Sequence, residues 1–306
     1  MRHRISVADL ETALNGSLCP LLRERVELAD LTYENISPEE RDAYLIEVIE
    51  TLIKPNIVKA GPHRRADWEV GWSENLAALQ QGTPVEAIMP RYHGKNRLVR
   101  WRQELVRPVA PLFDYRIHTI IVDWAIDTFL KQASSLYEFG CGPAYHLLRA
   151  RQFNAGARLV GLDWATASQK IIGEIVSRGI EKNIQGVNFD FFHPDHAIDF
   201  PPGSGVYTVA ALEQVGADFE PFLQFLIKKR PTICVHLEPV EELLDQRNLV
   251  DRLSQLYFQK RNYLRGFLTR LRELRDLGQI TIHREQRTYT GSFFIEGHSL
   301  VVWSPN

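Results

Sequence analysis

From about residue 117 onward, the apolar positions of the chain alternate between a helical and a strand-like spacing. A core-facing helix is predicted by the i, i+3, i+4, i+7 pattern of Ile117, Ile120, Ile121 and Trp124. Short apolar runs typical of buried strands follow at residues 135–140, 158–164, 186–192, 205–212 and 232–238. Most are separated by helical segments, at residues 145–153, 165–178 and 219–229. This alternation predicts an α/β fold with right-handed crossovers and a doubly wound, mostly parallel sheet.

The last fifty residues break this alternation. A long helix is predicted there, ending at Gly278, with one apolar face formed by Leu264, Phe267, Leu268 and Leu271. Two strand patterns, at residues 280–289 and 299–303, then follow with no helix between them. We therefore expect a C-terminal antiparallel hairpin at one edge of the sheet.

The first hundred or so residues predict helices and irregular structure, with no run of strands. The clearest helix begins at Ser37, which is followed by Pro38 and a capping-box glutamate, and it ends before Pro55. Trp68 and Trp72 lie one helical turn apart, beside two arginines, and are expected to pack on the α/β domain or to line an acceptor site. We divide the chain into a mainly helical region, residues 1–112, and an α/β domain, residues 113–306.

The composition is that of an ordinary globular protein: 306 residues, 44% hydrophobic and 24% charged, with a formal net charge of −2. No stretch approaches the roughly 18 apolar residues of a membrane helix, so we expect no membrane partner and a cytoplasmic location. The three cysteines are too few and too scattered for a disulfide framework, and we interpret them as structural thiols. The slightly negative net charge argues against a protein built to hold long nucleic acids.

One segment, residues 91–107, departs from this average because only Glu104 opposes its cations. The cationic residues are Arg91, Lys95, Arg97, Arg100, Arg102 and Arg107. The segment is either a solvated basic face or the wall or lid of a site for an anionic substrate.

The segment 136–145, LYEFGCGPAY, has the form of a strand that leads into a tight turn and a helix. Gly140 and Gly142, on either side of Cys141, permit backbone angles that let main-chain groups approach a ligand. Glu138 is placed to accept a hydrogen bond from a hydroxyl or ammonium group. The dinucleotide pattern GxGxxG would need a glycine or alanine where Tyr145 stands. This mismatch weakens the hypothesis of a nicotinamide-dependent oxidoreductase.

At these residues the chain resembles the class I, Rossmann-like, S-adenosylmethionine (SAM)-dependent methyltransferases, whose first motif is (E/D)xGxGxG. Glu138, Gly140 and Gly142 match the motif, and Ala144 replaces its third glycine. The resemblance covers residues 117–306 and implies a seven-stranded sheet with SAM as cofactor. It also implies which residues bind the cofactor. The glycine turn from Glu138 to Gly142, Cys141 included, is the first part. The others are Asp163 at the ribose hydroxyls, Trp164 on the adenine, Asp190 at the adenine amino group, and the backbone of Phe191 beside it.

Methyl transfer needs an aligned acceptor and the removal of one proton, but no nucleophilic side chain. Glu213, which follows the fourth strand of the sheet, is our first choice for the general base or acceptor-orienting group. It could instead cap a turn. His193 is a second candidate base, although it is equally suited to a surface turn. Glu238 could join Glu213 in holding a divalent cation, but we predict no metal.

Two features of the sequence bear on the chemical nature of the methyl acceptor. The sequence ALEQ after the fourth strand does not match the (N/D)PP(Y/F/W) motif of enzymes that methylate amino groups of nucleic-acid bases, which favours oxygen on a small molecule. Arg97 and Arg100 are expected to bind a phosphate or carboxylate of this acceptor if the basic segment folds over the site. Two alternatives stay open: structured RNA as the acceptor, and a non-catalytic SAM-binding module whose N-terminal region serves a partner.

Overall fold

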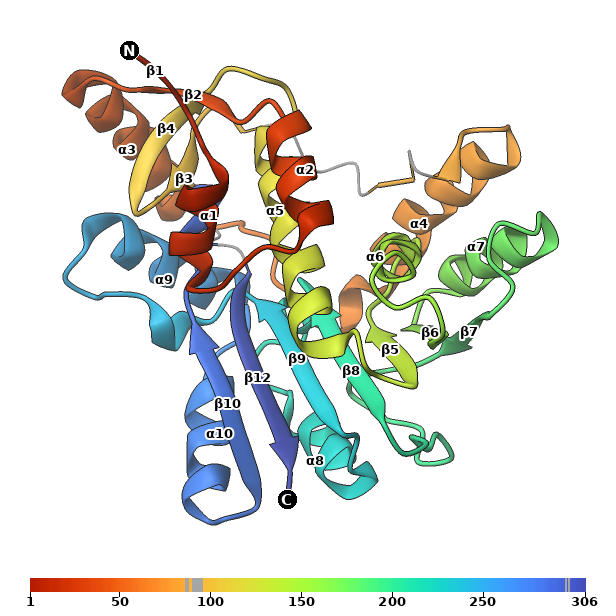
Figure 1. Cartoon of the computed structure of the whole chain (residues 1–306). Helices are drawn as coiled ribbons and strands as arrows, with labels where there is room; N and C mark the ends of the chain where they lie inside the picture. The colour runs from red at the N-terminus through yellow and green to blue at the C-terminus, as the bar shows by residue number, and fades with distance from the viewer. Residues whose placement is uncertain (86–87, 90–95, 295, 297) are drawn as a thin grey trace.

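The computed structural model describes residues 1–85, 88–89, 96–294, 296 and 298–306. A seven-stranded sheet with the order β10-β12-β9-β8-β5-β6-β7 forms its centre (Figure 1). The parallel strands are β5 (Ser135–Phe139), β6 (Arg158–Asp163), β7 (Ile184–Asn188), β8 (Ser204–Val209) and β9 (Ile233–Glu238). At one edge, β12 (Ser299–Pro305) runs antiparallel to both β9 and β10 (Ile280–Gln286). The predicted mostly parallel sheet with a C-terminal antiparallel hairpin is therefore confirmed.

Helices cover both faces of this sheet because successive side chains of each strand point to opposite faces and both sets are apolar. In β5, Leu136 packs into one hydrophobic core and Phe139 into the other. The first core contains residues of α5 (Phe113–Ala125), α6 (Tyr145–Ala150) and α7 (Thr166–Ser177). The second contains residues of α8 (Glu220–Lys229) and α10 (Phe267–Asp276). Figure 1 shows α5 in front of the sheet and α8 and α10 behind it.

Two elements of the structure end at residues other than those predicted from the sequence. The third strand ends at Asn188, so that Asp190 and Phe191 lie in the loop that follows it. The predicted long C-terminal helix is two helices, α9 (Leu249–Arg261) and α10, with Leu264 in their connection. The break occurs because Asn262 adopts left-handed backbone angles (φ +54°), which end α9.

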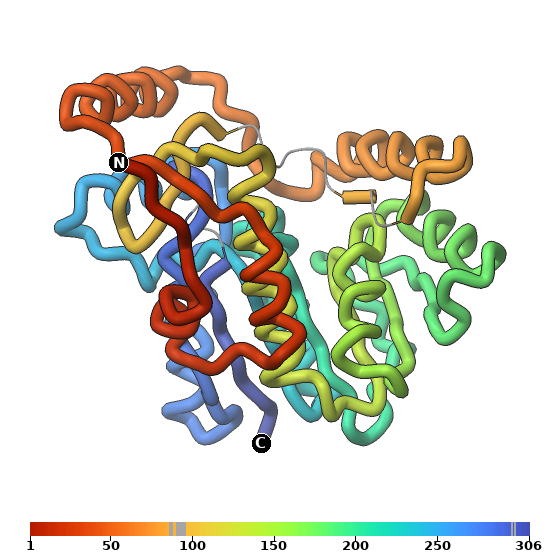
Figure 2. Tube along the Cα trace, turned by 45° about the horizontal axis from the view of Figure 1, so that its top comes forward, coloured from red at the N-terminus to blue at the C-terminus, as the bar shows by residue number. Residues whose placement is uncertain are grey.

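The N-terminal region is mainly helical, as predicted. Its α-helices are α1 (Val7–Leu14), α2 (Pro20–Leu28), α3 (Pro38–Ile53) and α4 (Arg65–Gln80). The predicted N-cap of α3 is present, since the Ser37 side chain accepts a hydrogen bond of 3.2 Å from the Glu40 backbone N–H. Figure 2 shows this region crossing from α3 on one side of the molecule to α4 on the other.

The expectation that this region lacks strands was wrong. A second, antiparallel sheet has the order β1-β2-β4-β3-β11. Its strands are β1 (Arg2–Arg4), β2 (Thr32–Asn35), β3 (Val99–Trp101), β4 (Glu104–Pro108) and β11 (Thr290–Gly291). Such short strands show no alternating pattern, and the tight turn between β3 and β4 places Arg102 and Gln103 at positive φ where a glycine or asparagine would have signalled it. Because β11 comes from the C-terminal part of the chain, this sheet joins the two predicted regions.

Within the described residues, no helix is both long and apolar enough to cross a membrane.

Candidate functional site

A cleft lies where β5, β6 and β8 end, beneath α4 of the N-terminal region. It has a volume of about 60 Å³. Its walls are formed by Trp68, Trp72, Gly140, Asp163, Trp164, Phe191, Phe192, Ala210, Ala211, Gln214 and Val215. Four of the predicted cofactor-binding residues, Gly140, Asp163, Trp164 and Phe191, thus meet in one place.

The glycine turn forms the floor of this cleft. Gly140 has φ +72°, and a Cβ added there would lie 2.4 Å from the Cβ of Ala211. The backbone N–H groups of Gly140 and Cys141 both donate to the carbonyl of Leu162, at 2.7 and 3.1 Å. Ala144 adopts the left-handed conformation, φ +61°, that the third glycine of the motif would adopt freely. The turn is therefore fixed to the end of β6 and leaves its backbone close to the cleft.

Asp163 connects the glycine turn to the beginning of α7. Its Oδ2 accepts the N–H of Gly142 at 2.9 Å, and its Oδ1 accepts the N–H of Ala165 at 2.8 Å. Burial raises the pKa of this carboxyl group to about 6. Each carboxylate oxygen can accept a further hydrogen bond. The side chain is thus held rigidly at the cleft wall and keeps acceptor capacity for hydroxyl groups of a ligand.

Glu138 and Cys141 lie below the turn and do not line the cleft. The Glu138 side chain is completely buried, where the hydroxyl of Tyr207 donates to its Oε2 at 3.1 Å. Burial raises the pKa of Glu138 well above its usual value. Glu138 therefore bonds to the neighbouring strand β8, whereas the sequence had suggested direct contact with a ligand.

Helix α4 closes the other side of the cleft. A Cβ added at Gly142 would lie 2.7 Å from the ring of Trp72, which itself stacks on Trp68 with ring centroids 5.7 Å apart. Glu69 accepts hydrogen bonds from the backbone N–H groups of Thr166 and Ala167, at 2.6 and 3.1 Å. A carboxylate at this position stabilises the N-terminus of α7 and fixes α4 against it.

Asp190 and His193 lie in the loop after β7, and neither lines the cleft. Asp190 accepts the backbone N–H of Phe192 at 2.9 Å. The side chain of His193 is 85% exposed, with its Nδ1 at 3.5 Å from Asp190. The structure therefore places His193 in a surface turn, outside this cleft.

A larger cavity of about 350 Å³, here called the acceptor cavity, adjoins the cleft. The two share Trp68, Ala210 and Gln214. The remaining lining residues are Arg64, Asn96, Val99, Arg100, Phe113, Asp114, Ile117, His118, Glu213, Arg261, Tyr263, Thr290, Gly291, Ser292 and His298. Its walls combine the N-terminal region, α5, the turn after β8, α9 and the segment between β11 and β12.

Glu213 is the predicted catalytic residue that the structure does place in this cavity. It is 8% exposed, and Nε2 of Gln214 donates to its Oε1 at 2.9 Å. Burial and the neighbouring Glu238 raise the pKa of Glu213 to about 8, although the bond from Gln214 and the charge of Arg261 oppose this. A carboxyl group with such a pKa can exchange a proton near neutral pH.

Glu238 lies behind Glu213 and does not reach the cavity. Its Oε1 accepts the backbone N–H groups of Ala211 and Leu212 at 3.0 and 3.1 Å, and its Oε2 accepts that of Glu213 at 3.3 Å. It therefore orders the short 3-10 helix Leu212–Gln214 that presents Glu213. Among the described residues, no group of three or more histidine, cysteine, aspartate or glutamate side chains is placed to hold a metal ion.

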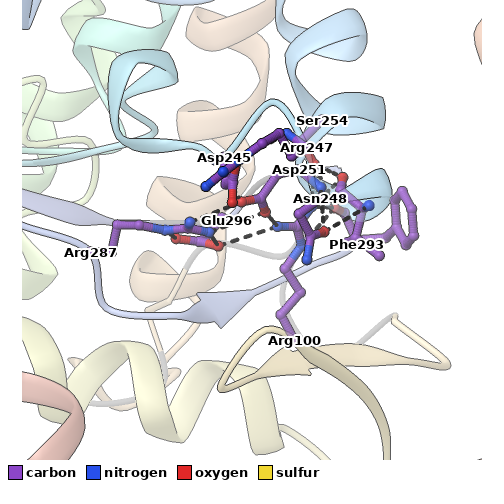
Figure 3. Close-up of polar contacts among 10 residues, drawn as sticks. Arg100, Asp245, Arg247, Asn248, Asp251, Ser254, Arg287, Phe293 and Glu296 are labelled. Carbon is purple, nitrogen blue, oxygen red and sulfur yellow. Dashed lines mark hydrogen bonds and ion pairs between the residues drawn. The ribbon is translucent and has the colours of Figure 1, made fainter.

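The two arginines predicted to bind the acceptor have other partners. Arg97 lies outside the acceptor cavity, where its exposed guanidinium pairs with Glu47 at 2.9 Å. Arg100 is 1% exposed and belongs to a buried cluster of four charges, shown in Figure 3. Its Nη1 lies 2.9 Å from Asp251 and 3.2 Å from Glu296, both of which also pair with Arg287.

The rest of the basic segment follows the same pattern. Arg102 pairs with Asp9 at 2.9 Å, and Arg107 pairs with Glu34 and Glu40. Arg91 and Lys95 lie outside the described residues. The positive charges of the four described arginines of this segment are thus neutralised by carboxylates from distant parts of the chain.

Sequence reasoning missed Arg261, His118 and His298 in the cavity wall. The rings of the two histidines have centroids 4.0 Å apart. None of the three belongs to a motif, and only the fold brings them together. Trp68, in contrast, was expected to pack on the α/β domain or to line an acceptor site, and it lines the cavity together with Arg64.

No protein-family model matches the sequence, and a search of curated proteins found no match. Solved structures do resemble it. The (4+2)-cyclase SpnF has a TM-score of 0.50 at 13% identity, over 82% of this chain and 97% of its own. Magnesium protoporphyrin IX methyltransferase from Synechocystis PCC 6803 with bound SAH scores 0.47 at 14% identity, over 63% and 86%. Human N-acetylserotonin methyltransferase in complex with SAM scores 0.45 at 13% identity, over 80% and 68%.

Sequence identities this low are informative about the fold alone. The strand order of the sheet, its terminal antiparallel hairpin and the likeness to SpnF confirm the predicted Rossmann-like fold, a doubly wound α/β sheet with a C-terminal hairpin.

Proposed function

We propose that the protein is a SAM-dependent methyltransferase that methylates a polar small molecule, with oxygen favoured as the methylated atom. The observation that carries this proposal is the junction of the two cavities. Ala210 and Gln214 line both the cleft at the glycine turn and the acceptor cavity, and Glu213 stands between them in sequence. A methyl donor in the cleft and an acceptor in the cavity would therefore meet beside a carboxyl group.

The residues of the cleft fit the cofactor. When bound, SAM would supply a methyl group activated by its sulfonium. Asp163 would hold the ribose hydroxyls, Trp164 and Phe191 would contact the adenine, and the backbone at Gly140 would approach the amino acid end. The cleft of about 60 Å³ is narrowed by Trp72, so this ring has to move from the glycine turn as the cofactor enters.

Glu213 would act as the general base. One of its Oε atoms takes the proton from the acceptor hydroxyl as the oxygen is methylated. Since its pKa is about 8, the active carboxylate form increases with pH. We expect the rate to rise tenfold per pH unit below about pH 8 and to level off above it.

Cofactor binding is tested by isothermal titration with SAM and with S-adenosylhomocysteine (SAH). We expect one site for each, weakened by roughly tenfold or more in Asp163→Ala because a charge-assisted bond to the ribose is lost. Asp195→Ala is the matched control, since Asp195 also accepts a backbone N–H, from Ala197 at 2.8 Å, but does so in an exposed loop. Absence of heat with both ligands in the wild-type protein would refute the proposal.

Catalysis is tested with SAM carrying a labelled methyl group and a broad panel of hydroxylated small molecules and structured RNAs. We expect label in a small molecule, and its loss in Glu213→Gln while SAH affinity is kept. Label in RNA would identify the alternative acceptor, although the ion pairs of Arg97, Arg102 and Arg107 leave that alternative little support. SAM binding without turnover of any acceptor would identify a non-catalytic module. The cytoplasmic location stays a prediction.

A further inference from the structure

The three arginines that line the acceptor cavity differ in their partners. Arg64 pairs with Asp67, and Arg100 pairs within the buried charge cluster. Arg261, at the end of α9, has no carboxylate within the 4.0 Å of an ion pair among the residues that the structure describes. Its positive charge therefore faces the cavity without an ion-pair partner among the described residues.

The position of the Arg261 guanidinium is nevertheless fixed. Its Nη1 donates to the carbonyl of Val58, and its Nη2 donates to the hydroxyl of Tyr263 at 3.1 Å. The rings of Tyr257 and Tyr263 lie 5.9 and 5.0 Å from it. Its backbone carbonyl accepts the N–H of Ala60 at 2.6 Å, which ties the end of α9 to the N-terminal region.

These contacts do not use the full hydrogen-bonding capacity of the group. A guanidinium carries five N–H donors, and the two bonds above leave three of them without a partner among the described residues. One of these is the buried Nε–H. A planar, rigidly held group with several unused donors matches the geometry of a carboxylate.

Among the described residues, neither acidic residue of the cavity wall forms an ion pair with Arg261. Asp114 already accepts hydrogen bonds from Nδ2 of Asn96 at 3.0 Å and from the backbone N–H of Tyr115 at 2.9 Å. Glu213 is close enough for the charge of Arg261 to act on it, but burial is the larger effect and raises its pKa to about 8. Glu213 is therefore mostly protonated at neutral pH, and a half-buried cation that lacks an anion is costly.

We infer that the methyl acceptor is a small carboxylic acid, whose carboxylate binds Arg261 while its hydroxyl faces Glu213. This inference rests on the proposed function, because it takes the occupant of the cavity to be the methyl acceptor. One uncompensated cation matches a monoanion, whereas a phosphate dianion would leave negative charge beside Glu213. The aromatic walls formed by Trp68, Phe113 and Tyr263 favour an acid with a planar ring.

The test uses matched pairs of aromatic acids and their primary amides, namely benzoate and benzamide, 4-hydroxybenzoate and 4-hydroxybenzamide, and indole-3-acetate and indole-3-acetamide. Binding is measured by ligand-observed NMR with SAH present. We expect the acids to bind roughly tenfold more tightly than the amides, as is typical of a charged hydrogen bond. We expect Arg261→Gln to abolish this preference. The control Arg97→Gln, an exposed arginine outside the cavity, should keep it.

Three results would overturn the inference: amides that bind as tightly as acids, no binding by either series, or an acid preference that survives in Arg261→Gln. Titration of SAH into the same samples distinguishes failure of the carboxylate inference from failure of the proposed function. Loss of SAH binding in the wild-type protein refutes the methyltransferase proposal, whereas SAH binding without acid preference refutes only the carboxylate. If Arg261→Gln fails to fold, the wild-type acid and amide comparison still decides, and Arg261→Lys should retain a weakened preference.

Discussion

Replacing Glu213 by glutamine should stabilise the protein at alkaline pH while it removes the proposed base. Glutamine has the same shape and can still accept the hydrogen bond from Gln214, but it cannot ionise. The wild-type carboxyl group, in contrast, must become charged in a buried position beside Glu238 before it can act. Such a group is expected to trade stability for activity.

The size of the effect follows from the pKa of Glu213, about 8 in the folded state against a usual value of 4.5. The folded protein binds this proton more tightly than the unfolded chain does. The stabilisation from the protonated group is therefore complete below about pH 4.5 and is lost as the pH rises towards 8. At about 1.36 kcal/mol per pKa unit, the wild-type protein should lose roughly 3 kcal/mol relative to Glu213→Gln between pH 5 and pH 8.

Urea denaturation of both proteins at pH 5 and pH 8, followed by tryptophan fluorescence, measures this difference. We expect free energies of unfolding within about 1 kcal/mol of each other at pH 5, and a clearly more stable variant at pH 8. Glu104→Gln, at an exposed position of β4, should change the free energy of unfolding by less than about 0.5 kcal/mol at both pH values. A difference between wild type and Glu213→Gln that does not depend on pH would refute the reasoning.

Three further predictions concern the buried charges, the glycine turn and the tryptophans. Arg100→Ala should lower the free energy of unfolding by roughly 3–5 kcal/mol, because it leaves two buried carboxylates with Arg287 as their shared partner and so one buried negative charge uncompensated. Arg97→Ala should cost less than about 1 kcal/mol; equal losses in urea denaturation would contradict these roles. Gly140→Ala should abolish SAH binding in calorimetry because its Cβ has no space at φ +72°, whereas Gly156→Ala, with no atom within 4 Å of the added Cβ, should bind normally; binding by both variants would exclude the turn from the site. SAH should change the tryptophan emission as Trp72 leaves the glycine turn, and Trp72→Phe should lose most of that change; an undiminished signal would show that the ring does not move.

The cofactor half of the site could be predicted because it is local in sequence. A strand, a glycine turn and the start of a helix lie within LYEFGCGPAY, and the backbone conformation needed at Gly140 limits which residues can occupy that position. Asp163 could be found in the same way, since it ends the next strand. Burial could not be predicted: the pattern that suggested Glu138 as a ligand-binding group does not show that Tyr207 covers it.

The acceptor half could not be predicted because its parts are distant in sequence. Net charge within residues 91–107 suggested an anion site there, but the carboxylates that neutralise Arg100 come from α9 and from the segment before β12. Arg261 carried no such signal, since Lys260 and Arg261 at the end of α9 are an ordinary basic last turn. What distinguishes Arg261 is that no carboxylate among the described residues forms an ion pair with it, and that is a property of the fold.

The turn after β8 explains how the two halves are held together. Ala210 adopts φ +49°, a left-handed conformation that costs an alanine about 1 kcal/mol or more. With this change of direction, the next three N–H groups bond to Glu238, which in turn fixes the position of Glu213. The same residue, Ala210, forms part of both the cofactor cleft and the acceptor cavity. Strain at this position is therefore best understood as the consequence of placing Glu213, the proposed base, where two cavities meet, and the bonds to Glu238 maintain this conformation.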